Sequence, residues 1–272
     1  MPHLSVIIPA YNEEKRLPST LESVHNYLSE SGQDFEIIIV DDGSSDNTRA
    51  VVNDFASTHC SVRLIAHTPN MGKGYSVREG MLKAEGDFLL LDDADGASPI
   101  AEVSRLLRAI EAGADVAIGS RAKPGDETVV KALSHRKHIG NTFNMIVQSS
   151  LLPGIQDTQC GFKLFKREVA KELFSIARLN RYAFDVEILY LARFKGYEIA
   201  EVPINWTNIE GSKINLVTDP LNMLFEIGKV ILWRICGSYG KLSKAKGRPG
   251  DATNAGSSQL GSGECKTEAE NK

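Results

Sequence analysis

The chain has 272 residues, of which 42% are hydrophobic, and its formal net charge at pH 7 is −4. A chain of this size and composition can bury one large core or two modest ones, and its negative charge argues against a nucleic-acid partner. The four cysteines include no CxxC pair, so they predict neither a zinc site nor a disulfide framework, and a reducing compartment is expected.

Targeting and membrane-spanning signals are not apparent in the sequence. The first residues, MPHLSVIIPAYNEE, have no charged region before an apolar stretch, unlike a secretory signal peptide. No apolar run approaches the roughly 18 uncharged residues that cross a bilayer. We therefore expect a protein that is soluble or lies on a membrane surface.

Five short apolar runs in the first half of the chain predict buried strands. Each is a near-continuous stretch of Val, Ile and Leu, as expected for parallel strands covered on both faces. The predicted strands are 4–9, 35–40, 62–66, 87–91 and 115–119. Amphipathic patterns of helical length lie between them, at 14–30, 46–57, 74–84 and 99–112. This alternation predicts an α/β fold with a mostly parallel sheet.

The second half of the chain is less regular. A predicted amphipathic helix ends near residue 151, and a loop with a short strand follows over 152–165. Further elements are predicted as helices near 166–177, 182–195 and 220–236, with a strand at 198–206. Residues 241–272 contain almost no apolar side chains, which predicts a disordered low-complexity tail.

Polar residues follow each predicted strand of the first half. In open α/β sheets, ligands bind beyond the carboxyl ends of the strands. The groups that follow the five strands in turn are Tyr11 and Glu13, Asp42, Lys73, Asp93 and Asp95, and Arg121. Taken singly, each has a simpler reading as a helix cap, a turn or an exposed charge, and Gly72-Lys73-Gly74 lacks the spacing of a P-loop. Because the five strand ends would converge on one edge, together they predict a ligand site.

Three carboxylates follow the buried run FLLL, in the segment DDADG at 92–96. Adjacent carboxylates repel one another, and burying them unpaired is costly. Asp93 and Asp95 alternate on an extended segment, so both can face one ion. Mg²⁺ or Mn²⁺ prefers such oxygen ligands together with substrate phosphates. The alternative interpretation of this segment is a solvated turn without a metal. We expect Asp93 and Asp95 to bind a metal, with Asp92 in a turn or supporting position.

Several motifs resemble those of a known family. PAYNEE, IIIVDDGSSD and LLLDDADG are similar to the inverting, nucleotide-sugar-dependent glycosyltransferases of family 2. That family has the GT-A fold, a Rossmann-like, mostly parallel sheet flanked by helices. The segments DTQCGFKLF (157–165), YAFDVE (182–187) and NWT to EGSK (205–213) resemble the subgroup that glycosylates polyprenyl phosphates. Within it they are more similar to dolichyl-phosphate β-glucosyltransferases than to mannose synthases.

The resemblance covers about residues 4–235 and implies a domain organisation. One GT-A domain would span 1–240, with a nucleotide-binding half over about 1–125 and an acceptor half over about 126–240. The tail at 241–272 would lie outside it.

The resemblance also implies roles for individual residues. Those implied to hold the nucleoside are Pro9, Tyr11, Glu13, Val40 and Asp42, with Asp42 on the base. Those implied to bind the metal–diphosphate group and neutralise its charge are Asp93, Asp95, Arg121 and Lys213, and Lys73 lies at the same predicted edge. Asp185 is the candidate catalytic base if one is used. For the acceptor phosphate we select Arg136 from the basic segment 131–140, although an ordinary exposed basic loop is an equal alternative.

The expected reaction is a metal-dependent, inverting transfer of glucose from UDP-glucose to a polyprenyl phosphate. Two alternatives keep the fold: a mannosyltransferase that uses GDP-mannose, and a family 2 enzyme with a hydroxyl acceptor. A phosphotransferase is disfavoured because Pro9-Ala10-Tyr11 offers no Asp nucleophile after the first strand. A non-catalytic binding module is disfavoured because both carboxylates of the expected metal site are present.

The lipid acceptor implies that the protein reaches a membrane. The chain begins at its first strand, so we expect either no anchor or a C-terminal helix lying in the membrane interface. That segment is alternatively a helix packed on the core. We expect a peripheral protein on the cytoplasmic face of a membrane.

Overall fold

The computed structural model describes residues 1–123, 125, 128–131, 147–148, 150–209 and 218–239. The predicted tail, and most of the helix predicted before residue 151, lie outside these residues. The strands of the main sheet are β1 (Leu4–Ala10), β2 (Phe35–Asp41), β3 (Val62–Ala66), β4 (Phe88–Leu91), β5 (Val116–Ser120), β7 (Lys163–Lys166) and β8 (Ile199–Pro203). β6 (Val130–Lys131) and β9 (Trp206–Thr207) form a separate parallel pair.

The seven strands lie in the order β3-β2-β1-β4-β7-β5-β8. All neighbours are parallel except β7, which runs antiparallel to both β4 and β5. The predicted α/β fold with a mostly parallel sheet is therefore confirmed. The reversed β7 was not predicted, and it has a consequence for the site. Because β7 starts at the edge where β4 and β5 end, the residues before Lys163 are brought to that same edge.

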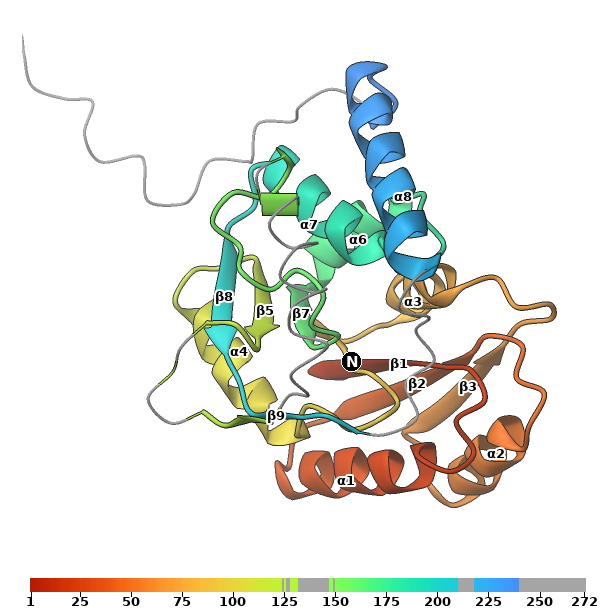
Figure 1. Cartoon of the computed structure of the whole chain (residues 1–272). Helices are drawn as coiled ribbons and strands as arrows, with labels where there is room; N and C mark the ends of the chain where they lie inside the picture. The colour runs from red at the N-terminus through yellow and green to blue at the C-terminus, as the bar shows by residue number, and fades with distance from the viewer. Residues whose placement is uncertain (124, 126–127, 132–146, 149, 210–217, 240–272) are drawn as a thin grey trace, which may run out of the picture.

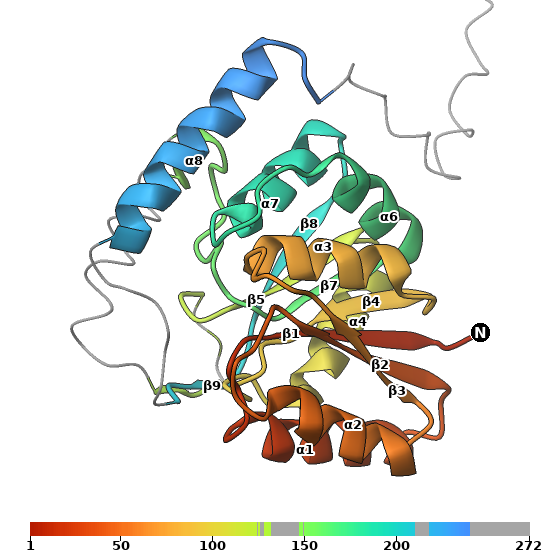
Figure 2. The ribbon, with the colours of Figure 1, turned by 90° about the vertical axis from the view of Figure 1, so that its right-hand side faces the viewer.

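Helices cover both faces of the sheet (Figures 1 and 2). One face carries α1 (Leu17–Glu30), α2 (Thr48–Thr58) and α4 (Val103–Glu111), which follows the 3₁₀ turn η1 (Ile100–Glu102). The other carries α3 (Lys73–Lys83), α6 (Arg167–Ile176) and α7 (Phe184–Phe194). α8 (Thr218–Ile235) lies on the outside of this second layer and contacts α7.

Two apolar cores result from this arrangement, one on each face of the sheet. Successive strand residues point to opposite faces, so Ile7 and Ile38 pack on the α3 side while Ile8 and Ile39 pack on the α1 side. All four side chains are fully buried. This double burial explains why the strands read as near-continuous apolar runs.

α8 packs on the core through only part of its surface. Ile227 and Val230 are buried, whereas Phe225, Leu232 and Ile235 are among the most exposed large apolar side chains of the described residues. Within the described chain, no helix is both long enough and apolar enough to span a bilayer.

Gly80 permits the close packing of α3 on the sheet. A Cβ added at this position would lie 2.5 Å from Ile7 Cγ2 and 3.0 Å from Val40 Cγ2. Both partners are fully buried and β-branched, so neither can move aside freely.

We predict that Gly80→Ala destabilises the protein by about 1–3 kcal/mol because it overpacks this contact. The matched control is Gly228→Ala in α8, where an added Cβ meets nothing within 4 Å. There, helix propensity should raise the free energy of unfolding by up to about 1 kcal/mol. Urea unfolding followed by circular dichroism measures both changes, and equal stability of Gly80→Ala and the wild type would contradict the packing argument.

Candidate functional site

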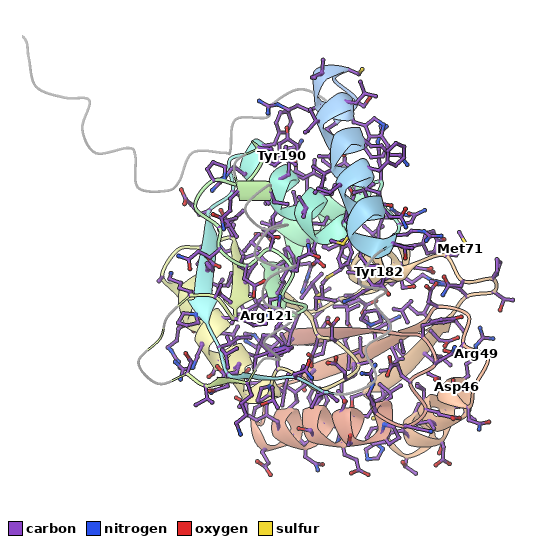
Figure 3. All side chains as sticks on the ribbon, in the orientation of Figure 1. Asp46, Arg49, Met71, Arg121, Tyr182 and Tyr190 are labelled. Atoms are coloured by element: carbon purple, nitrogen blue, oxygen red, sulfur yellow. The ribbon has the colours of Figure 1, made fainter. Side chains whose placement is uncertain are left out.

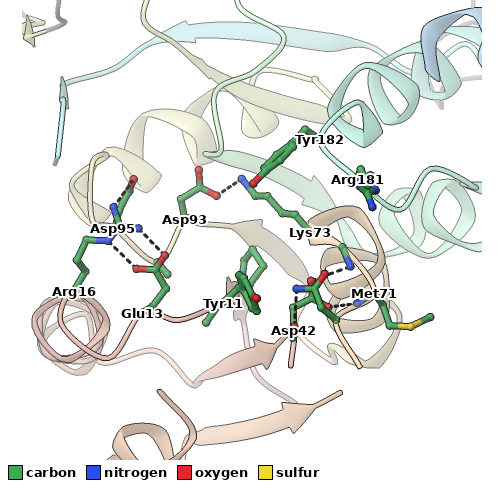
Figure 4. Close-up of a pocket in the computed structure, with 15 residues that line it drawn as sticks. Tyr11, Glu13, Arg16, Asp42, Met71, Lys73, Asp93, Asp95, Arg181 and Tyr182 are labelled. Atoms are coloured by element: carbon green, nitrogen blue, oxygen red, sulfur yellow. Dashed lines mark hydrogen bonds and ion pairs between the residues drawn. The ribbon is translucent and has the colours of Figure 1, made fainter. Parts of the chain in front are cut away.

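A cavity of about 340 Å³ opens beyond the carboxyl ends of β1, β2 and β4 (Figure 4). Its lining comes from the loops after these strands, from the start of α3 and from the loop before α7. The lining residues are Pro9, Ala10, Tyr11, Glu13, Arg16, Asp42, Asn70, Met71, Gly72, Lys73, Asp93, Ala94, Asp95, Arg181 and Tyr182. The cavity therefore lies at the edge of the sheet where the sequence predicts a ligand site.

The carboxylates that follow β4 differ in their surroundings. Asp92 is 2% exposed, whereas the side chains of Asp93 and Asp95 are 35% and 28% exposed and line the cavity. Burial and the charges of Asp93 and Asp95 raise the pKa of Asp92 well above its usual value. Burial and the charge of Asp93 also raise the pKa of Asp95. The cluster is thus a place where further positive charge is favourable.

Two cations already compensate part of this charge (Figure 4). The Lys73 ammonium lies 2.6 Å from Asp93 Oδ1, and Arg16 Nη1 lies 3.9 Å from Asp95 Oδ2. Arg16 also donates two hydrogen bonds to Glu13, at 2.7 and 2.5 Å. Burial by itself lowers the pKa of Lys73, but the charges of Asp93 and Asp185 outweigh it and raise that pKa, so Lys73 is protonated.

The open carboxylates fit a hard divalent cation. Asp93 and Asp95 are the oxygen donors that Mg²⁺ and Mn²⁺ prefer. No group of three or more metal-binding side chains occurs among the described residues. A cation held by these two carboxylates would therefore leave other coordination positions for water or for phosphate oxygens of a ligand, as is usual for Mg²⁺.

Asp42 shapes the wall of the cavity on the β2 side. Its carboxylate accepts hydrogen bonds from the backbone N–H of Met71 at 2.8 Å and of Gly72 at 2.9 Å. Gly72 has φ +99°, a conformation that favours glycine. Asp42 thus holds the turn from which α3 and Lys73 begin. It also lines the cavity, and its predicted contact with the base stays a prediction.

Arg121 forms an ion pair with Asp157, and neither residue lines the cavity. Its guanidinium donates two hydrogen bonds to Asp157, at 2.7 and 2.8 Å, and lies 5.3 Å from the ring of Trp206. Although burial alone raises the pKa of Asp157, Arg121 holds it below its usual value. Arg121 does not line the cavity and lies on the β5 side of the molecule, away from Met71 (Figure 3). Its predicted phosphate contact stays a prediction.

The two carboxylates of the YAFDVE segment have separate partners. Asp185 pairs with the buried Lys163 at 2.6 Å, and burial raises its pKa although Lys163 opposes this. Glu187 accepts hydrogen bonds from the backbone N–H of Arg178 and Leu179 and from the Tyr239 hydroxyl. A separation of two residues directs side chains to different faces of a helix, and α7 shows this divergence.

Several predicted residues are not brought to the cavity. Val40 is fully buried beneath Gly80 and does not line the cavity. Its predicted contact with the nucleoside stays a prediction. Lys213 and Arg136 lie outside the described residues. The cavity does contain the predicted Pro9, Tyr11, Glu13 and Lys73, together with Asp42, Asp93 and Asp95.

Three residues of the site were not predicted. Arg16 follows Glu13 by three residues at the start of α1, and this spacing of opposite charges is a signal that could have identified it. Arg181 carries no such signal. Gly161 lies directly against Asp93, because a Cβ added there would be 2.1 Å from Asp93 Oδ2. Only the antiparallel placement of β7 makes that contact visible.

Solved structures with the same fold include a UDP-glucose-binding enzyme. The chain superposes with a TM-score of 0.63 on glucosyl-3-phosphoglycerate synthase from Mycobacterium tuberculosis, crystallised with Mn²⁺, UDP and glucosyl-3-phosphoglycerate. The match covers 87% of this chain and 80% of that one, at 19% identity. A second structure of that enzyme, with Mn²⁺ and UDP-glucose, gives a TM-score of 0.61. At this identity the likeness concerns the fold, and it confirms the predicted GT-A fold.

Sequence relatives establish the family. The model of glycosyl transferase family 2 matches residues 5–174. Dolichyl-phosphate β-glucosyltransferase of Dictyostelium discoideum is 40% identical over 240 residues, which are 84% of this chain and 73% of that protein. The enzyme of that name from Homo sapiens is 40% identical over 224 residues, covering 78% and 69%. The chain therefore belongs to glycosyl transferase family 2, with the dolichyl-phosphate β-glucosyltransferases among its relatives.

Proposed function

We propose that this glycosyltransferase moves glucose from UDP-glucose to a polyprenyl phosphate of the dolichyl type, with inversion at the anomeric carbon. The observation that carries the proposal is the pair of open carboxylates, Asp93 and Asp95, at the end of β4 in a cavity that also contains Asp42 and Tyr11. The donor sugar and the acceptor class are supported by relatives at 40% identity that are named for this reaction.

The cavity suggests how the donor would bind. Asp42 and Tyr11 would hold the nucleoside, with the carboxylate of Asp42 accepting the imino N–H of uracil. Asp93 and Asp95 would hold Mg²⁺ or Mn²⁺ at the diphosphate. When bound, the cation would stabilise the negative charge that develops on the departing UDP. The structural neighbour crystallised with Mn²⁺ and UDP supports this choice of ligands.

The reaction would be a single displacement. An oxygen of the acceptor phosphate attacks the anomeric carbon, and the bond to UDP breaks with its electron pair leaving on UDP. A phosphate monoester has its second pKa at about 6, so it is already ionised near neutral pH and needs no general base. We assign Asp185 an electrostatic role. It pairs with Lys163 at 2.6 Å, and its negative charge helps to raise the pKa of Lys73.

A donor panel tests the proposed reaction. Purified protein with Mn²⁺ and either a short polyprenyl phosphate or the corresponding polyprenol is given radiolabelled UDP-glucose, UDP-galactose or GDP-mannose, and the lipid product is extracted into organic solvent. We expect label in the lipid phase from UDP-glucose and none after addition of EDTA. Label from GDP-mannose instead would show that the sugar is wrong, and label on a hydroxyl acceptor but not on the phosphate would correct the acceptor.

We predict that Asp95→Asn lowers the rate of transfer by at least about a hundredfold, because it removes one negative oxygen from the proposed cation site. The binding of Mn²⁺ in the presence of UDP, measured by electron paramagnetic resonance, should weaken in parallel. The control is Asp54→Asn, the same change on the exposed surface of α2. Unchanged Mn²⁺ binding in a folded Asp95→Asn protein would remove Asp95 from the metal site.

We also propose that α8 brings the enzyme to the cytoplasmic face of a membrane. Its apolar side chains Phe225, Leu232 and Ile235 are 69%, 56% and 76% exposed, and Lys229 lies beside Phe225. Exposed apolar residues with neighbouring basic groups are typical of helices that lie in the interface of an anionic membrane.

We predict that the triple variant Phe225→Ser, Leu232→Ser, Ile235→Ser sediments with anionic phospholipid vesicles much less than the wild type does. UDP binding should be retained, because these residues do not line the cavity. Leu82→Ser, which removes an exposed apolar side chain from α3, serves as the control and should sediment normally. Equal sedimentation of all three proteins would place the membrane contact elsewhere.

A further inference from the structure

Three basic residues line the cavity within the described part of the chain. They differ in whether a carboxylate is paired with them. Arg16 is bound to Glu13, and Lys73 is bound to Asp93. Arg181 is exposed, and its guanidinium forms no ion pair with any carboxylate of the described residues. Arg181 is therefore the cation of this set that is available to an anionic ligand.

The backbone beneath Arg181 is held firmly on the α3 side. Asn180 O accepts a hydrogen bond from Tyr75 N at 3.2 Å, and a Cβ added at Gly72 would lie 2.3 Å from the same oxygen. Arg78 donates to Asn180 Oδ1 at 2.9 Å. The backbone position of Arg181 is therefore fixed before a ligand binds, and binding has to order only its side chain.

Arg181 lies in the same cavity as the proposed metal site, on the other side of Lys73 from Asp93 (Figure 4). Figure 4 shows Arg181 and Asp95 at opposite sides of the cavity. On the other side of Arg181 lies α8, where Glu226 interacts with the backbone of Ala183 and with the charge of Arg181. The residue before Glu226 is Phe225, whose side chain is 69% exposed. Arg181 thus lies between the cavity and the part of α8 that carries Glu226 and the exposed Phe225.

A ligand with a phosphate head and an apolar chain matches this juxtaposition. Building on the acceptor class proposed above, we propose that Arg181 binds the phosphate of the lipid acceptor and that the chain of the lipid extends toward α8. A guanidinium binds phosphate through two parallel hydrogen bonds. The diphosphate of the donor has the same chemistry, so the test measures the two ligands separately.

Isothermal titration calorimetry with citronellyl phosphate, a short water-soluble prenyl phosphate, and with UDP plus Mn²⁺ tests the assignment. We expect Arg181→Gln to weaken citronellyl phosphate binding by about ten- to a hundredfold and to leave the Kd of UDP unchanged. Arg181→Lys should give an intermediate loss. Glu226→Gln should tighten binding of the prenyl phosphate, because it removes a negative charge near the site. Arg193→Gln, an equal loss of charge on the exposed surface of α7, is the control.

Two results would overturn the assignment. If Arg181→Gln weakens UDP binding but leaves prenyl phosphate binding unchanged, Arg181 binds the donor and not the acceptor. If the binding of both ligands is unchanged, Arg181 binds neither of them. These measurements do not require glucose transfer. If the wild type binds citronellyl phosphate through Arg181 but transfers another sugar, the proposed donor fails while the assignment of Arg181 is supported.

Discussion

The mutual repulsion of the carboxylates after β4 is the constraint on which the cavity depends. Asp92 is buried, and Asp93 and Asp95 open into the cavity. Their compensating charges come from separate segments, Lys73 at the start of α3 and Arg16 at the start of α1. Three loops are therefore held to one centre by electrostatic attraction, and a divalent cation with a diphosphate would extend the same balance of charge.

The loop from Ala177 to Ala183 connects this centre to the outer helix. Glu187 accepts hydrogen bonds from the start of the loop and, at 2.7 Å, from the hydroxyl of Tyr239 just after α8. Arg78 of α3 donates to Ala177 O at 3.2 Å. The loop that presents Arg181 to the cavity is thus held by α3, α7 and the end of α8. The proposed acceptor side of the cavity and the proposed membrane helix are therefore linked through the hydrogen bonds of this one loop and of Glu187.

Much of the first half of the chain was predictable because its signals are local. Continuous apolar runs indicated strands buried on both faces, and the polar residues after each run were expected at one edge of a parallel sheet. The residues selected after the first four runs, including Tyr11, Asp42 and Lys73, do line the cavity. Arg121 also follows its strand as expected, but its partner is Asp157, 36 residues away in the sequence. No local pattern indicates such a pairing.

Local patterns in the sequence were enough to predict the alternation of strands and helices and the acidic segment at the end of β4. Only the folded chain shows that β7 enters the sheet antiparallel between β4 and β5, which places Gly161 against Asp93. The same fold places Arg181 at the cavity, where it forms no ion pair with the described carboxylates although the charge of Glu226 acts on it. Periodicity and capping act within a few residues, whereas strand order and the choice of ion-pair partners depend on contacts between distant segments, and a local pattern therefore cannot reveal them.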